Sequence, residues 1–134
     1  MIHIAVFEDD SFYHLSAKRI LSKVFEGKVL DIQIYKHWTD FEEQYQTEPI
    51  KHLDYVFLDD DLGRDAHGRF AHGEKVKKNL ELLGFAPKFV GISRVDRDYV
   101  PFNIGKFPGS HDLDVFHLSE ANIVDLRQKM AILA

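Results

Sequence analysis

The stretch YVFLDDDLG, residues 55–63, sets four apolar residues directly before three consecutive aspartates. A short apolar run bounded by polar residues is typical of a strand that is buried on both faces of a parallel sheet. The side chains of Asp59, Asp60 and Asp61 repel one another unless a cation or a solvated cleft compensates their charge. The stretch therefore predicts a buried strand that ends either in a solvated loop or at a metal site.

Apolar periodicity predicts that strands and helices alternate along the rest of the chain. Strands are expected at residues 2–7, 29–35, 54–58, 88–93 and 114–118. Helices are expected at residues 11–26, 39–46 and 73–83 and after Ser119, with an irregular stretch after Ser93. This alternation predicts an α/β fold, a doubly wound five-stranded parallel sheet with helices on both faces.

Length, composition and charge narrow the classes of protein that fit. The 134 residues, 45% of them hydrophobic, suit a single domain over 1–134. A net charge of −5 provides no basic surface for nucleic acid, so we expect no nucleic-acid partner. The sequence has no cysteine and no apolar run of signal-peptide or membrane-span length, which predicts a cytoplasmic protein without a membrane partner.

Polar side chains follow three of the predicted strands. Glu8 and Asp9 follow the first, Asp59 the third, and Ser93 the fourth. Because the carboxyl ends of parallel strands meet at one edge of a sheet, we expect these groups to converge. Carboxylate oxygens suit Mg²⁺, and an aspartate beside Mg²⁺ can attack a phosphoryl donor while a hydroxyl and a cation hold the phosphate oxygens.

Three motifs carry a resemblance to a known family. IAVFEDD at residues 4–10, DYVFLDDDL at 54–62 and FVGIS at 89–93 resemble, in that order, the first, third and fourth strands of the receiver domain of two-component response regulators. The resemblance spans essentially the whole chain. It implies a flavodoxin-like sheet with strand order 2-1-3-4-5.

The resemblance also implies a role for each matching residue. Asp59 would be the phosphorylated residue, and Glu8 and Asp9 would be the acidic pair that binds Mg²⁺ together with Asp59. Asp61 would be a metal ligand through its backbone carbonyl, and Ser93 would be the switch hydroxyl. The neighbouring aspartates at positions 10 and 60 would have no direct role.

The chain departs from the family pattern at three places. Gly63 stands where the family usually has proline, and the loop from it to the third helix is longer than usual. Arg94 follows the switch hydroxyl, where the family has a small residue, and could pair with the site or crowd it. The family's lysine at the end of the fifth strand is replaced by His117 or Leu118, which leaves Lys106 as a candidate for the phosphate contact.

We therefore expect a stand-alone response regulator receiver that takes a phosphoryl group from a histidine kinase or phosphotransfer protein onto Asp59. The chain ends soon after the last predicted helix, so signalling is expected through contact with a downstream protein target. The alternative is a pseudo-receiver, which keeps the fold and binds its partner without phosphorylation. The missing fifth-strand lysine and Arg94 favour that alternative.

A third reading is enzymatic. LDDDLG, residues 58–63, also resembles the signature of haloacid-dehalogenase-like phosphatases, with Asp59 as nucleophile and Asp61 as general acid. The later motif residues would be Ser93, Lys106 and either Asp112 or Asp114. Against this reading, the acidic pair after the first strand would have no role.

Overall fold

The computed structural model describes residues 1–64, 68, 70–101, 103–106 and 120–133. Its strands are β1 (Ile2–Phe7), β2 (Leu30–Tyr35), β3 (Tyr55–Leu58), β4 (Asp61–Arg64), β5 (Phe70–His72) and β6 (Lys88–Gly91). Its helices are α1 (His14–Val24), α2 (Trp38–Thr47), α3 (Gly73–Leu82) and α4 (Glu120–Leu133). The short 3₁₀ helix η1 (Ser11–Tyr13) directly precedes α1. No helix among these residues is long and apolar enough to cross a membrane.

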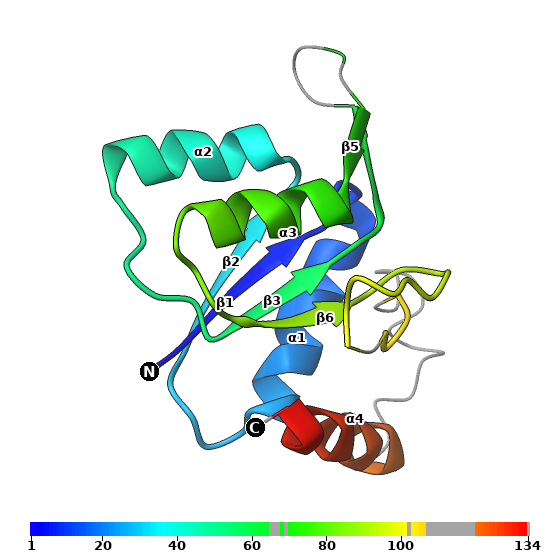
Figure 1. Cartoon of the computed structure of the whole chain (residues 1–134). Helices are drawn as coiled ribbons and strands as arrows, with labels where there is room; N and C mark the ends of the chain where they lie inside the picture. Colours follow the sequence, from blue (N-terminus) through cyan, green and yellow to red (C-terminus); the bar gives the residue numbers. More distant parts are fainter. Residues whose placement is uncertain (65–67, 69, 102, 107–119, 134) are drawn as a thin grey trace.

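The central sheet is parallel and has the order β2-β1-β3-β6 (Figure 1). Its four strands lie at the first four predicted strand positions, with ends that differ from the prediction by two residues or fewer. The α/β prediction with a parallel sheet is therefore confirmed. All four strands are short and largely apolar, as expected for strands covered on both faces.

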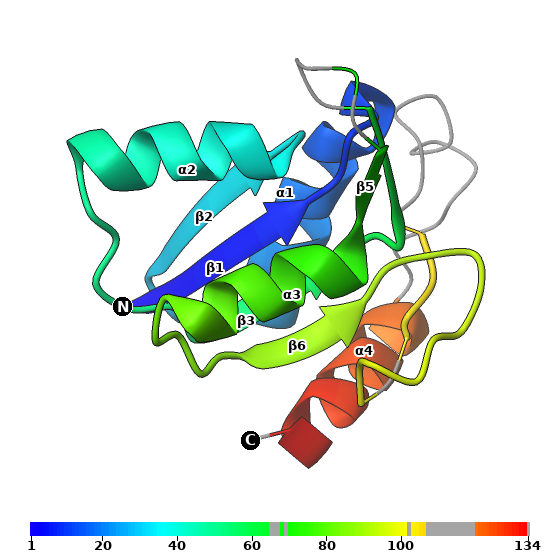
Figure 2. The same ribbon diagram turned by 45° about the horizontal axis from the view of Figure 1, so that its top comes forward.

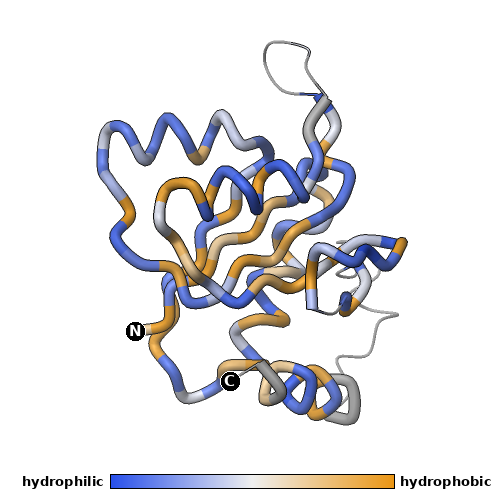
Figure 3. The backbone as a smooth tube through the Cα atoms, viewed as in Figure 1, coloured by the Kyte–Doolittle hydropathy of each residue, from blue (hydrophilic) through white to orange (hydrophobic). Residues whose placement is uncertain are grey.

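The core consists of two layers of side chains, one on each face of the sheet. Ile4 and Val6 of β1 point to the face that α1 and α4 cover, where they join a cluster that includes Met130. Ala5 and Phe7 point to the opposite face and pack with residues of α2 and α3. Figure 2 shows the helices on the two sides of the sheet, and Figure 3 shows hydrophobic residues concentrated along the central strands.

A segment that was not predicted to be a strand contacts the edge of β6. Asn103 forms an isolated parallel bridge with Gly91, and the Ile104 amide donates a hydrogen bond to the Gly91 carbonyl at 2.9 Å. The predicted fifth strand at 114–118 lies outside the described residues, so a five-stranded order 2-1-3-4-5 is not confirmed. The bridge brings Lys106, three residues further on, to the carboxyl end of the sheet.

The predicted long loop after Gly63 contains a hairpin. β4 pairs antiparallel with β5, with Asp61 opposite His72 and Arg64 opposite Phe70. In Figure 1 this hairpin stands beyond the carboxyl ends of the central strands, and α3 follows it directly. The sequence predicted a longer loop here but not the pairing of β4 with β5, which form a separate two-stranded sheet.

Gly73 begins α3 in very close contact with the end of β3. A Cβ atom at this position would lie 2.4 Å from the backbone oxygen of Asp59 and 2.7 Å from the hydroxyl of Tyr99. Gly73→Ala is therefore expected to lower the free energy of unfolding by about 1–3 kcal/mol, although alanine is the better helix former. Urea denaturation measures this change.

Gly91→Ala is the matched control. Its Cβ would contact the side chains of Asn103 and Val100 at 3.0 Å and 3.1 Å, and these side chains can shift more easily than backbone. The loss of stability should be smaller than for Gly73→Ala. Equal urea midpoints for Gly73→Ala and the parent would contradict the close packing of α3 on β3.

Candidate functional site

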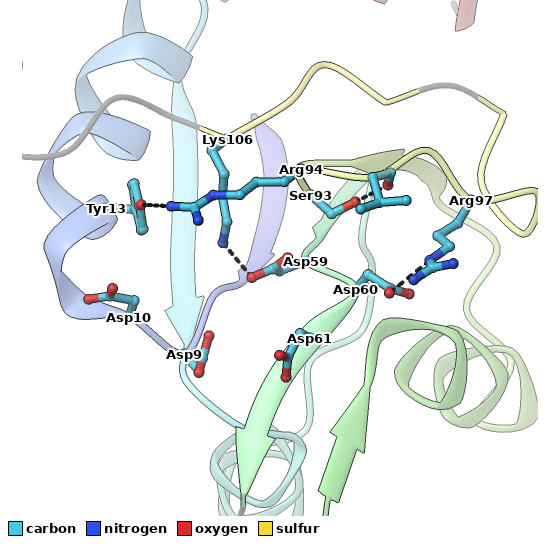
Figure 4. Close-up of a pocket in the computed structure, with 11 residues that line it drawn as sticks. Asp9, Asp10, Tyr13, Asp59, Asp60, Asp61, Ser93, Arg94, Arg97 and Lys106 are labelled. Carbon is cyan, nitrogen blue, oxygen red and sulfur yellow. Dashed lines mark hydrogen bonds and ion pairs between the residues drawn. The ribbon is translucent and has the colours of Figure 1, made fainter.

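The carboxyl ends of β1, β3 and β6 meet at a pocket of about 430 Å³ (Figure 4). The pocket is lined by both acidic and basic side chains. They are Asp9, Asp10, Asp59, Asp60, Asp61, Arg94, Arg97 and Lys106. Ser93 and Tyr13 also line it. Asp59, Asp9 and Ser93, which were predicted to converge because they follow parallel strands, thus share one pocket.

A compact cluster of carboxylates includes Asp9 and Asp59 of this pocket and Glu8, which does not line it. Oxygen atoms of Glu8, Asp9 and Asp59 all lie within 4.8 Å of one another. Glu8 is 1% exposed and Asp59 is 4% exposed, so two of the three groups are buried. Hard oxygen ligands at this spacing fit a divalent cation such as Mg²⁺, and no thiol is available to favour a softer metal.

Lys106 neutralises part of this negative charge. Its Nζ atom lies 2.6 Å from Oε1 of Glu8 and 2.5 Å from Oδ2 of Asp59. Burial alone would lower the pKa of Lys106, but hydrogen bonds to Asp59 and Glu8 hold the pKa above its ordinary value. The ammonium group therefore stays charged at neutral pH. The sequence-based alternatives His117 and Leu118 lie outside the described residues.

Burial has the opposite consequence for Glu8. It raises the pKa of Glu8 to about 8, helped by the negative charge of Asp59 and opposed by the hydrogen bond from Lys106. Ionised Glu8 is therefore unfavourable in the folded protein, even with the ammonium group beside it. An added cation beside Glu8 would favour its ionised form and lower its pKa.

Asn103 holds the segment that carries Lys106, a role that nothing in the sequence pattern indicated. Its side-chain oxygen accepts a hydrogen bond from the Ser93 amide at 3.0 Å, and its Nδ2 donates to the Ser93 carbonyl at 2.8 Å. Its side-chain oxygen also accepts from the amide of Gly105 at 3.3 Å. The edge segment is thus attached to the end of β6 by one side chain as well as by the backbone.

Ser93 lies in the pocket, but its hydroxyl points into its own loop. The Oγ atom donates to the carbonyl of Val95 at 2.5 Å, and the residue is 7% exposed. Figure 4 shows it beside Asp59. In this conformation the hydroxyl is committed to a local turn.

Asp60, predicted to have no direct role, anchors the loop after β6. Its carboxylate accepts hydrogen bonds from Nε of Arg97 at 2.8 Å and from the hydroxyl of Tyr99 at 2.7 Å. Burial raises the pKa of Tyr99, and the bond to Asp60 raises it further, so the hydroxyl remains a donor. Lys77 of α3 also donates to the carbonyl of Tyr99. Asp60 thus joins β3 to the loop, and Lys77 ties the loop to α3.

Gly63 allows the hairpin to approach the acidic cluster. Its φ of 66° is a conformation that favours glycine, and a Cβ there would lie 2.8 Å from Oδ2 of Asp9. The carboxylate of Asp61 is exposed and accepts a hydrogen bond from the Gly63 amide at 2.9 Å. Asp10 has a different role, because its carboxylate accepts a hydrogen bond from the amide of Phe12 and thereby caps η1. The positive φ and the close packing on Asp9 therefore favour glycine at position 63.

Glu8→Gln is expected to change how stability depends on pH. Because the folded-state pKa of Glu8 is raised from 4.5 to about 8, its contribution to stability is lost as the pH rises through that window. Glutamine does not titrate, so the stability of the variant relative to the parent should increase with pH, by at most about 1.4 kcal/mol per pH unit. Urea unfolding of both proteins across this window measures the difference, and a constant difference would contradict the raised pKa.

Comparison with known proteins supports the fold. No family model matches the sequence, and no curated protein matches it. The structure is similar to a response regulator receiver protein from Burkholderia phymatum, with a TM-score of 0.62 and 17% identity over 99% of this chain and 95% of that one. It is also similar to a fusion of a trimeric coiled-coil segment of yeast Spc42 to another protein, with a TM-score of 0.61 and 13% identity over 98% of this chain and 80% of that one. At these identities the likeness shows a receiver-like fold.

Proposed function

We propose that this domain is a phosphoacceptor of two-component signalling, in which Asp59 takes a phosphoryl group from a histidine kinase or phosphotransfer protein. One observation carries the proposal. The buried carboxylate of Asp59 ends a central strand of a receiver-like fold, pairs with the ammonium of Lys106, and lies within 4.8 Å of the carboxylates of Glu8 and Asp9. A buried nucleophile between a cation and a group of metal ligands is suited to phosphoryl transfer.

The proposed reaction is an in-line displacement at phosphorus. A carboxylate oxygen of Asp59 forms a bond to phosphorus while the P–N bond of the donor phosphohistidine breaks, and the imidazole leaves with the electron pair. Lys106, 2.5 Å from the attacking carboxylate, neutralises charge on the transferred group. Mg²⁺ held by Glu8, Asp9, Asp59 and the Asp61 carbonyl would supply further charge neutralisation. The Ser93 hydroxyl would leave Val95 and donate to a phosphoryl oxygen.

The output is proposed to pass through the loop after β6 to a downstream protein target. Phosphorylation replaces one carboxylate charge by about −1.5 to −2 at a single point. The described residues between β6 and Lys106 contain no helix, so the surface next to the phosphoacceptor is a loop attached through Asp60 and Asn103. A cytoplasmic location and the absence of nucleic-acid and membrane partners also belong to this proposal.

The test of this function is intact-mass spectrometry after incubation with Mg²⁺ and acetyl phosphate. The parent should gain one hydroxylamine-labile phosphoryl group, and Asp59→Asn should gain none, because the carboxamide is nearly the same size but is not a nucleophile. Asp61→Asn is the matched control and should still be labelled, since only its backbone carbonyl has a proposed role. If the parent and an Arg94→Met variant are both folded and both stay unlabelled, the result would count against a working phosphoacceptor, since Arg94 lines the same pocket as Asp59.

The same Asp61 variant tests the phosphatase reading. A haloacid-dehalogenase-like enzyme would hydrolyse a generic phosphomonoester and would lose turnover in Asp61→Asn, because Asp61 would be its general acid. The exposed carboxylate of Asp61 is bonded to the amide of Gly63. We expect no turnover by the parent.

Mg²⁺ is expected to raise the melting temperature. Binding to the folded state alone stabilises it, by about 2.7 kcal/mol when the free Mg²⁺ concentration is 100 times the dissociation constant. Asp9→Asn should weaken this shift, because Asp9 belongs to the cluster of carboxylates within 4.8 Å. Asp10→Asn is the control, since Asp10 lines the same pocket but caps η1, and asparagine also caps helices. An unchanged melting temperature in the parent would contradict the cation site.

A pseudo-receiver is the second candidate, and one observation favours it. Lys106 already compensates Glu8 and Asp59 from within the chain, so the folded state does not depend on an added cation for charge balance. A domain of this kind would bind its partner constitutively. The acetyl phosphate experiment separates the two candidates, because only the receiver acquires a labile phosphoryl group on Asp59.

A further inference from the structure

A hydrogen bond joins the two sides of the pocket. Arg94 follows β6, and its Nη2 atom donates to the hydroxyl of Tyr13, the last residue of η1, at 3.1 Å. Figure 4 shows the arginine side chain extended from the Ser93 side toward Tyr13 on the opposite side. Both residues line the pocket that contains Asp59.

The order of the strands places this bond across the phosphoacceptor. Tyr13 belongs to the segment after β1 and Arg94 to the segment after β6, while β3 lies between these two strands in the sheet. Asp59 is the first residue after β3. A connection from the end of β1 to the end of β6 therefore passes over the end of β3, where the buried carboxylate of Asp59 lies.

Tyr13 is held in place by two further contacts. The ammonium of Lys106 lies 4.8 Å from the centre of its ring, at the distance of a cation–π interaction, and Phe12 packs edge-on against the same ring. Arg94, by contrast, is exposed. The fixed partner is thus the tyrosine, and the arginine is the side chain that can swing away at little cost in packing.

We propose that Tyr13 and Arg94 form a gate that slows the access of small phosphodonors to Asp59. The gate deepens the proposed function and rests on it. A small donor makes few contacts beyond its phosphoryl group, so it gains little binding energy to compensate for breaking the hydrogen bond from Arg94 to Tyr13. A protein donor can compensate for breaking this bond through contacts elsewhere on its interface. The pair thereby selects for a protein donor and limits non-specific phosphorylation.

The experiment compares initial rates of labelling by acetyl phosphate in the presence of Mg²⁺. Tyr13→Phe removes the bond but keeps the aromatic ring and the charge of Arg94. Arg94→Met removes the guanidinium group while keeping an exposed side chain of similar length. Each variant should be labelled about tenfold faster than the parent, the range expected for losing one charge-assisted hydrogen bond. Arg19→Met removes an exposed arginine of α1 outside the pocket and should leave the rate unchanged.

The outcomes separate failure of the gate from failure of the proposed function. If the parent is labelled as fast as Tyr13→Phe or faster, the gate is overturned and the proposed phosphoacceptor function stands. If Arg94→Met is labelled more slowly than the parent while Tyr13→Phe is unchanged, the gate is also overturned. That result would mean that Arg94 binds the phosphodonor rather than excluding it. Labelling of the variants without labelling of the parent would support the gate. No labelling of parent or variants would overturn both proposals. Arg94→Met, at an exposed position, decides the outcome if Tyr13→Phe does not fold.

Discussion

The ammonium of Lys106 between the carboxylates of Glu8 and Asp59 is the interaction on which the rest of the site depends. Two carboxylates this close repel each other, and burial together with the charge of Asp59 raises the pKa of Glu8 to about 8, although Lys106 opposes the rise. Removing one member of a buried charged group leaves the others without compensation, which is far more costly than losing a surface pair. The sheet can therefore end in buried acids only because a lysine reaches them.

The position of that lysine is set by a few contacts in an irregular segment. Pro101 is unfavourable in a regular strand, and so is Gly105, whose φ is 80°. Among the described residues, this segment joins the sheet edge through one bridge at Asn103 and one backbone hydrogen bond from Ile104. The Asn103 side chain adds its bonds to Ser93. The loop in between is fastened to the site by Asp60. The same loop carries Arg94, so the charge of the pocket and access to it depend on one stretch of chain.

The parallel sheet and its acidic edge could be predicted because their causes are local. Apolar runs such as residues 55–58 have no stable place except between two helical layers, and the residues that follow parallel strands must share one edge. The meeting of Glu8, Asp9 and Asp59 follows from that rule alone. The bridge at Asn103 could not be predicted, because a single bridged residue beside Gly91 has almost no strand pattern. The hairpin of β4 and β5 was missed for a similar reason, since its strands are only four and three residues long.

The amino-acid pattern alone specifies the α/β class, the four central strands and the acidic groups that follow them, because burial and strand polarity act on neighbouring residues. The cation that compensates those acids, the bond from Asp60 to its loop and the bond from Arg94 to Tyr13 emerge only in the folded chain. These contacts join residues that are 37 to 98 positions apart, and each depends on how separate loops meet above the sheet. No local pattern of residues specifies such a meeting, because it arises only when the packed sheet brings the strand ends together.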